Sequence, residues 1–277
     1  MQLAFHGACT IKAKLETDIR NAQKAGYSAL EIWTEKLDVY LEQHTVEDLK
    51  ALFLQHKIEP KTLNSIEAIA FRGAEFSQLV KRCGELCQIA TILGSPAIAV
   101  IPSAKPELQT SWKDIVNEHV KVLRELSSVA KPHGIKLAFE FLGSPWYSVR
   151  TPRGTQEIIE RAACDNVGMV FDIAHFAIGG GRLEEIDALD PSMIYGFHVD
   201  DVEDTAREAY LDSMRVLPGQ GIAPVQEICA RLKKIGYDGA CAIELFRPDY
   251  WERDPLEVAK MARVAALQAL EPYFDVH

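Results

Sequence analysis

The sequence contains no uninterrupted apolar segment that could span a lipid bilayer. A transmembrane helix needs about 20 predominantly apolar residues, and the most apolar segment, TILGSPAIAVIPS, is interrupted by Gly94, Pro96 and Pro102. The N-terminal segment MQLAFHGACTIKAK has no basic start followed by a long apolar run, so it does not resemble a signal peptide. We therefore expect a cytoplasmic protein that has no membrane partner.

The sequence also lacks an excess of positive charge. It contains 30 lysines and arginines against 40 aspartates and glutamates, which gives a formal net charge of −10. A protein that binds nucleic acid displaces counterions from phosphates and needs a basic surface to do so. The composition therefore argues against a nucleic-acid partner.

Cysteines with the spacing of a metal or redox motif are missing as well. The 6 cysteines are scattered along the chain. Cys83 and Cys87 lie one helical turn apart in a segment with helical periodicity, but no second Cys or His pair is near them in the sequence. We expect both to be small core residues in a protein of the reducing cytoplasm.

The 277 residues do contain a regular alternation of short apolar runs and amphipathic segments. The runs are nearly continuous in apolar residues, as in strands that are buried on both faces. They cover residues 3–8, 29–33, 58–66, 97–103, 135–142, 167–175, 194–200 and 240–246. Several intervening segments carry apolar residues at helical spacing and end at Gly26, Gly94, Gly134 or Gly236, as expected for left-handed helix C-caps.

Strands that alternate with helices over this length predict a (β/α)8 TIM barrel, with residues 1–277 as one domain. A doubly wound open sheet is the alternative, but it usually has a glycine-rich phosphate loop after its first strand, and HGACTIKAK is not such a loop. The longest segment without periodicity, 200–224, is expected to form a lid or a wall of the binding site. Its acidic start is typical of a solvated loop, although Asp200 and Asp201 directly follow a candidate metal ligand.

The last four predicted strands each end in an ionisable residue that follows apolar residues. These residues are Glu140, Asp172, His198 and Glu244. All strands of such a barrel end at one face, where barrel enzymes have their active sites. Three carboxylates and an imidazole that converge there repel one another unless a cation is present. We therefore predict that they bind one divalent metal ion, and this ligand set suits Mn, Co, Zn or Mg.

Further residues near strand ends are candidates to contact a substrate. His175 follows Asp172 by one helical turn and is a candidate substrate hydrogen-bond donor or a second metal ligand. Arg215 precedes the turn sequence LPGQG, which can place its guanidinium over an oxyanion or enediolate. A surface arginine beside a structural turn is nearly as consistent with the sequence. Weaker candidates are His6, Glu31, Trp33, Asn64, Trp146 and Arg247.

These positions resemble the metal-ligand pattern of the xylose isomerase-like TIM-barrel superfamily, which includes sugar isomerases, epimerases, inosose dehydratases and apurinic endonucleases. Within it, the segments FHVDDVED, RVLPGQG and AIELFRPDYW are similar to those of the inosose isomerases, and the likeness extends over the whole chain. The resemblance implies that the family's ligands correspond to Glu140, Asp172, His198 and Glu244. The endonucleases share Asp172-x-x-His175, but they need further histidines at places where this chain has Asn64 and Ile101.

The resemblance implies an isomerase of inositol catabolism that acts on a polyol ketone or ketose. It would shift the carbonyl of 2-keto-myo-inositol to the neighbouring carbon through an enediol, with Glu140 and Glu244 as candidates for carrying the proton. A metal-bound carboxylate is a weak base, and His175 as the base would resolve this conflict, while Arg215 would stabilise the enediolate. The alternatives are a dehydratase that acts on inosose or 3-dehydroshikimate, and a non-catalytic metal-dependent sugar-binding protein. The sequence leaves open whether the chain forms a homo-oligomer.

Overall fold

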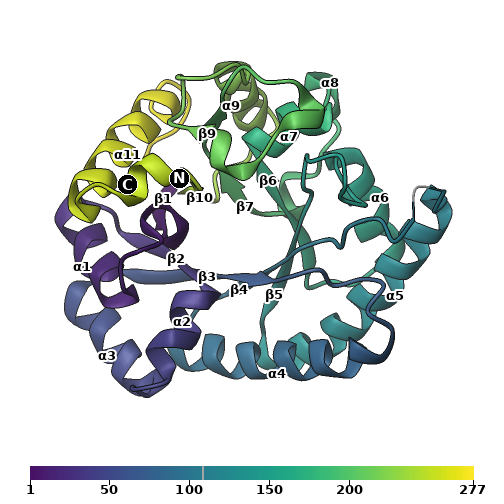
Figure 1. The fold of residues 1–277 in the computed structure, drawn as a ribbon, viewed down its shortest axis with the longest axis horizontal. Helices are drawn as coiled ribbons and strands as arrows, with labels where there is room; N and C mark the ends of the chain where they lie inside the picture. The colour runs from purple at the N-terminus through teal and green to yellow at the C-terminus, as the bar shows by residue number, and fades with distance from the viewer. Residues whose placement is uncertain (108) are drawn as a thin grey trace.

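The computed structural model describes residues 1–107 and 109–277. Its parallel strands close into a barrel in the order β1-β10-β7-β6-β5-β4-β3-β2, and helices surround the barrel (Figure 1). The barrel strands are β1 (Gln2–His6), β2 (Ala29–Trp33), β3 (Glu59–Ile66), β4 (Ala97–Val100), β5 (Lys136–Glu140), β6 (Val167–Asp172), β7 (Ile194–His198) and β10 (Ala240–Ile243). The predicted (β/α)8 barrel is confirmed.

The helices follow the strands along the chain. They are α1 (Leu15–Ala25), α2 (Thr34–Leu41), α3 (Val46–His56), α4 (Phe76–Leu93), α5 (Trp112–Ala130), α6 (Pro152–Ala162), α7 (Ile173–Gly179), α8 (Leu183–Ile186), α9 (Val225–Lys234), α10 (Pro248–Trp251) and α11 (Pro255–Leu270). Gly26 and Gly94 adopt left-handed φ values of 90° and 82° after α1 and α4, as predicted. Cys83 and Cys87 are both buried in α4, which confirms them as core residues.

Strand β6 is shorter than the predicted strand at 167–175. The carboxylate of Asp172 accepts a hydrogen bond from the backbone N–H of His175 at 2.6 Å, so Asp172 is the N-cap of α7. An N-cap satisfies an amide of the first helical turn, which starts the helix at that residue. The same aspartate therefore ends the strand and begins the helix.

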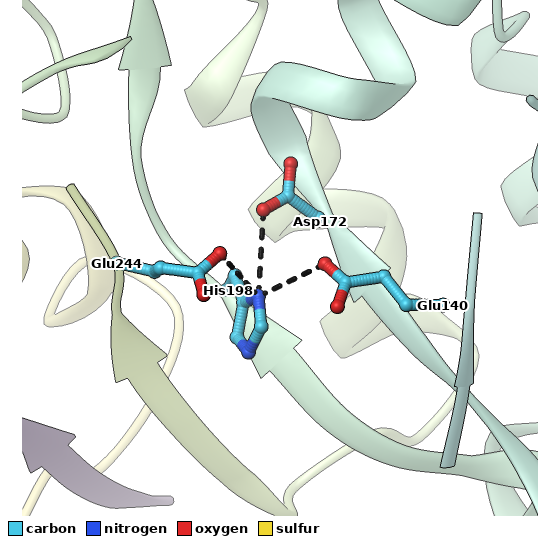
Figure 2. A group of neighbouring side chains, drawn as sticks. All are labelled: Glu140, Asp172, His198 and Glu244. Atoms are coloured by element: carbon cyan, nitrogen blue, oxygen red, sulfur yellow. Dashed lines mark ion pairs between the residues drawn. The ribbon is translucent and has the colours of Figure 1, made fainter. Parts of the chain in front are cut away.

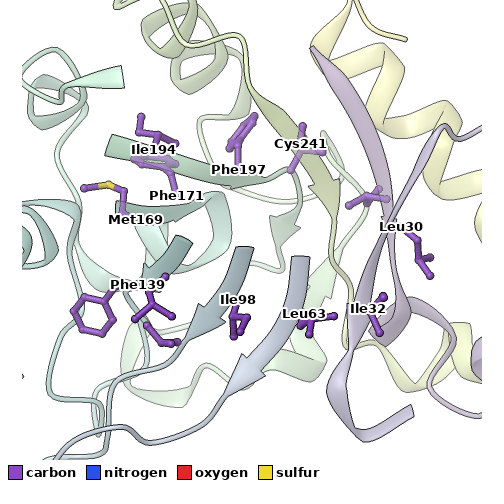
Figure 3. Close-up of a cluster of buried hydrophobic side chains, with 14 of the residues drawn as sticks. Leu30, Ile32, Leu63, Ile98, Phe139, Met169, Phe171, Ile194, Phe197 and Cys241 are labelled. Atoms are coloured by element: carbon purple, nitrogen blue, oxygen red, sulfur yellow. The ribbon is translucent and has the colours of Figure 1, made fainter. Parts of the chain in front are cut away.

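Side chains alternate between the two faces of each barrel strand. Outward residues such as Leu30, Phe139 and Phe197 belong to the main hydrophobic core (Figure 3). Inside the barrel, Ala4, Ala29 and Ala242 form a separate small cluster. The next inward positions on these strands are His6, Glu31 and Glu244. On these three neighbouring strands an alanine therefore lies one inward position before each ionisable side chain.

The segment after β7 folds around Asp201 instead of forming a solvated acidic loop. Strands β8 (Asp201–Val202) and β9 (Arg215–Val216) pair in antiparallel orientation. The buried carboxylate of Asp201 accepts hydrogen bonds from the N–H groups of Gly219, Gly221 and Ala223 at 2.8–3.0 Å. A Cβ atom at Gly221 would lie 2.1 Å from the carbonyl oxygen of Val202, so only glycine fits this turn. The expectation of a solvated loop is wrong for Asp200 and Asp201, because both carboxylates are buried and bound.

The two ends of the chain lie side by side (Figure 1). The N–H of Leu3 donates to the carbonyl oxygen of His277 at 3.0 Å. Within the described residues, none of the helices has the length and apolar composition of a membrane span.

Candidate metal centre

Glu140, Asp172, His198 and Glu244 meet at the carboxyl ends of β5, β6, β7 and β10 (Figure 2). Nδ1 of His198 lies 3.2 Å from Oε1 of Glu140 and 3.2 Å from Oε2 of Glu244. It lies 3.4 Å from Oδ2 of Asp172. One ligand atom from each residue lies within 4.8 Å of the others, and none of the four residues is more than 3% exposed. The structure therefore brings all four predicted ligands to one point.

The charges of this cluster are unbalanced. Burial alone would lower the pKa of His198, but the carboxylates of Glu244 and Glu140 outweigh it and raise that pKa well above its ordinary value. Burial raises the pKa of Glu140 to about 8. For Glu244, burial acts to raise the pKa, but the neighbouring His198 and His6 outweigh it and hold the pKa below its usual range. The raised pKa values of Glu140 and His198 both reflect an excess of buried negative charge, which a bound cation would offset.

The four residues fit a divalent ion. Oε1 of Glu140 and Nδ1 of His198 are buried and have no hydrogen-bond partner in the described part of the chain. Ligand atoms about 2.1 Å from one ion in tetrahedral arrangement are about 3.4 Å apart. The separations of 3.2 and 3.4 Å around Nδ1 of His198 match that spacing. Carboxylate oxygens with one imidazole nitrogen form a ligand set for Zn, Mn, Co or Mg.

Arg215 lies beside this cluster with only 1% of its side chain exposed. Nη1 lies 2.5 Å from Oδ2 of Asp172 and also pairs with Oδ2 of Asp200, and Nη2 lies 2.9 Å from Nε2 of His175. These contacts exclude the alternative of a surface arginine. Because Nε2 of His175 accepts from the guanidinium, the proton of its neutral imidazole is on Nδ1. Burial lowers the pKa of His175, which favours this neutral form.

A cavity of about 220 Å³ opens onto the cluster. It is lined by Trp33, Glu35, Asn64, Glu67, Ile101, Glu140, Leu142, Tyr147, His175, Asp212, Arg215, Glu244 and Phe246. Of the weaker sequence candidates, Trp33 and Asn64 are therefore placed at the cavity. Trp146 is 43% exposed, and Arg247 pairs with Glu203 at 2.7 Å; neither belongs to the cavity lining.

The sequence did not single out several residues of this lining. Glu35, Glu67, Tyr147 and Asp212 follow strands by varying distances in loops or short helices, so no periodicity marks them. Phe246 was detectable in principle, because it lies two residues after Glu244 and therefore on the same side of the extended chain. The pairing of Asp200 with Arg215 has no local signal in the sequence.

The parallel barrel and its candidate metal ligands agree with what a comparison of the chain with known proteins finds. The sequence profile of the xylose isomerase-like TIM barrel family matches residues 19–266. The chain belongs to this family. It is 33% identical to an inosose isomerase of Halalkalibacterium halodurans, over 100% of this chain and 99% of that protein. It is 32% identical to the inosose isomerase of Bacillus subtilis, over the full length of both.

One solved structure is similar over nearly the whole chain. The crystal structure of the IolI protein with a bound zinc atom matches with a TM-score of 0.96 and 32% identity, over 99% of this chain and 100% of that one. The full-length relatives are isomerases, so the predicted enzyme class is confirmed.

Proposed function

We propose that this xylose isomerase-like protein binds one divalent metal ion through Glu140, Asp172, His198 and Glu244 and isomerises a polyol ketone of the inosose type. The observation that carries the proposal is the convergence of these four buried side chains next to a cavity of about 220 Å³, which Glu140 and Glu244 line. Similarity to inosose isomerases over the full chain supports the substrate class. The zinc atom bound to the IolI protein supports a divalent ion here, and the ligand set also suits Mn, Co or Mg.

The proposed reaction moves the carbonyl of 2-keto-myo-inositol to the neighbouring ring carbon. A proton leaves the carbon beside the ketone, an enediol forms, and a proton is added to the former carbonyl carbon. Glu140 and Glu244 both line the cavity and are the candidates to take and return that proton, although a bound ion makes a ligand carboxylate a weaker base. A bound divalent ion supplies positive charge that offsets the negative charge on the substrate oxygens.

Arg215 and His175 would orient the substrate and stabilise charge. Arg215 lines the cavity and is fixed by Asp172 and Asp200, so its positive charge is preorganised for an oxyanion. The Nε2 lone pair of His175 already accepts from Arg215. This contact favours a hydrogen-bond donor role for His175 over the role of general base, and it leaves proton transfer to the glutamates.

The charge of the cavity wall favours a neutral substrate. Glu35, Glu67 and Asp212 line it in addition to the candidate ligands, whereas Arg215 is the cation among the described lining residues and is already paired. Carboxylates accept hydrogen bonds from hydroxyl groups and repel anions. A neutral inosose therefore fits this wall better than 3-dehydroshikimate, which carries a carboxylate, and this weighs against that dehydratase alternative.

Incubation of metal-loaded protein with 2-keto-myo-inositol in deuterated water, followed by NMR, tests the proposal. We expect an isomeric inosose of unchanged formula, apart from deuterium incorporated beside the carbonyl. A dehydratase would yield a diketone or its enol with loss of water, and a sugar-binding protein would leave the ketone unchanged. Conversion of a different ketose, with this ketone untouched, would contradict the substrate while leaving the isomerase class intact.

A further inference from the structure

Three polar side chains lie next to the candidate ligands. His6 ends β1, Glu31 lies in β2 and Asn64 lies in β3, and we call them the supporting triad. Each side chain is at least nine-tenths buried. His6 and Glu31, like His198, are absent from the lining of the cavity among the described residues. His6 and Glu31 therefore contact the candidate ligands and do not face the substrate cavity.

Glu31 is the centre of this triad. Its Oε1 accepts a hydrogen bond from Nδ2 of Asn64 at 2.9 Å. The same oxygen lies 3.4 Å from Nε2 of His198 and 3.9 Å from Nε2 of His6. Nδ1 of His6 accepts from the N–H of Ala8 at 3.0 Å, so the proton of a neutral His6 is on Nε2 and faces Glu31 and Glu244. One carboxylate oxygen thus faces nitrogen donors from three different strands.

The two nitrogens of His198 have opposite surroundings. Nδ1 faces the carboxylates of the candidate ligands, and Nε2 faces Glu31. A neutral imidazole has one N–H and one lone pair, and only the nitrogen with the lone pair can bind an ion. Nε2 has no hydrogen-bond partner at the distances of the present structure. A ring shift of about 0.5 Å would bring it within the 2.7–2.9 Å of a charge-assisted hydrogen bond to Glu31.

We propose that Glu31 is a positioning residue that holds the proton of His198 on Nε2 and so directs the Nδ1 lone pair at the metal ion. Asn64 fixes the carboxylate of Glu31 by donating to the same oxygen. This role differs from the substrate contact expected for Glu31 from its place at a strand end. Carboxylates that accept from a metal-bound histidine fix its tautomer and orientation, and their removal typically costs about 10–100-fold in metal affinity. The inference rests on the proposed metal centre.

The test is a Zn²⁺ titration of the metal-free full chain in competition with a chelator. Glu31→Gln keeps the size of the side chain and should weaken Zn²⁺ binding about 10–100-fold. Glu67→Gln is the matched control, because it also removes one carboxylate near the cavity, but its partner is Ser65 and not His198. We expect this control to bind Zn²⁺ like the wild type. Equal losses in both variants would overturn the positioning role in favour of a general charge effect, and so would unchanged affinity in Glu31→Gln.

A second measurement needs no variant and therefore does not depend on the folding of Glu31→Gln. In the Zn²⁺-loaded wild type, NMR of ¹⁵N-labelled histidine should show the His198 proton on Nε2. A proton on Nδ1 of His198, or none on either nitrogen, would overturn the proposal. Failure of the wild type to bind Zn²⁺, Mn²⁺, Co²⁺ or Mg²⁺ at all would instead contradict the metal centre itself, so the two failures are distinguishable.

Discussion

Nη1 of Arg215 lies 2.5 Å from Oδ2 of Asp172, and both side chains are buried. Asp172 ends barrel strand β6, whereas Arg215 begins β9 in the segment that follows β7. The guanidinium also pairs with Asp200, so it neutralises two buried carboxylates at the edge of the candidate metal centre. This pairing attaches the segment after β7 to the centre and leaves Arg215 in the cavity lining.

We expect Arg215→Met to separate catalysis from metal binding. The ligand set is unchanged, so the variant should still contain about one equivalent of metal ion. Its kcat for the inosose should fall by at least about 100-fold, because a fixed positive charge for the oxyanion is lost. The metal-free variant should also unfold more easily, by about 3–5 kcal/mol, since Asp200 is left buried without its counter-charge. Steady-state kinetics, elemental analysis and denaturant unfolding measure these three effects.

Arg247→Met is the matched control for this substitution. Arg247 is partly exposed and pairs with the half-exposed Glu203, and surface pairs of this kind contribute about 0–1 kcal/mol. We expect its stability to stay within that range and its kcat to be near that of the wild type. Wild-type turnover in Arg215→Met would contradict the proposed oxyanion role.

Removal of the imidazole of His198 should abolish metal binding. Protein purified without chelator should contain about one equivalent of a divalent ion, since four protein ligands suffice for one ion. His198→Ala should lose most of it, because a nitrogen ligand is missing from the centre. His119→Gln replaces a buried histidine of α5 that is not among the candidate ligands and should retain the metal ion. Full metal occupancy in His198→Ala, measured by elemental analysis, would rule out this ligand set.

The acidic cavity wall should exclude anions, and neutralising it should admit them. In the Glu67→Gln/Asp212→Asn double variant, 3-dehydroshikimate should inhibit isomerisation about 30-fold more strongly than in the wild type. The reason is the loss of two repulsive charges, each on the order of 1 kcal/mol at several ångströms in a partly solvated cavity. Tyr147→Phe changes the same wall without changing its charge and should leave the inhibition constant nearly unaltered. An equal inhibition constant in the double variant and the wild type would show that the wall does not select against anions.

Much of the barrel and all four candidate ligands could be predicted from the sequence, for one physical reason. In a closed parallel barrel every strand ends at the same face, so residues at equivalent places in separate strands meet in space. Glu140, Asp172, His198 and Glu244 each follow an apolar stretch that predicts a strand and places the residue at its carboxyl end. The positions of these residues in the sequence therefore suffice to predict that their side chains meet in the folded protein.

The remaining residues of the site depend on loops whose path is determined by tertiary contacts. Asp212 reaches the cavity because β8 and β9 pair, and because Asp201 binds the amides of the turn at Gly219 and Gly221. Neither contact has a periodic signature in the sequence. The role of His175 could not be predicted for a similar reason, because it depends on the position of Arg215, which lies in the next irregular segment.

Acid sensitivity should depend in part on His119, a residue of α5 that is not among the candidate ligands or the cavity lining. Its imidazole is buried, Nδ1 contacts the carbonyl oxygen of Ile115 at 2.8 Å, and the ring packs against Phe71 and Phe139. Burial lowers the pKa of His119 from 6.5 to about 4. The unfolded chain therefore takes up this proton at a higher pH than the folded protein does. The stability contribution is complete above pH 6.5 and is lost as the pH falls towards 4.

Between pH 7 and pH 5 the lowered pKa of His119 should reduce the free energy of unfolding by about 2 kcal/mol, given 1.36 kcal/mol per pKa unit. The free energy of unfolding, measured with denaturant in the same metal state, should fall less between pH 7 and pH 5 in His119→Gln than in the wild type. The expected difference is about 2 kcal/mol. Val122→Ala, a buried substitution on the same helix, removes no titrating group and should lower the free energy of unfolding equally at both pH values. His119→Gln and the wild type should therefore converge in stability as the pH falls, whereas parallel curves would mean that the buried imidazole is protonated as easily as in the unfolded chain.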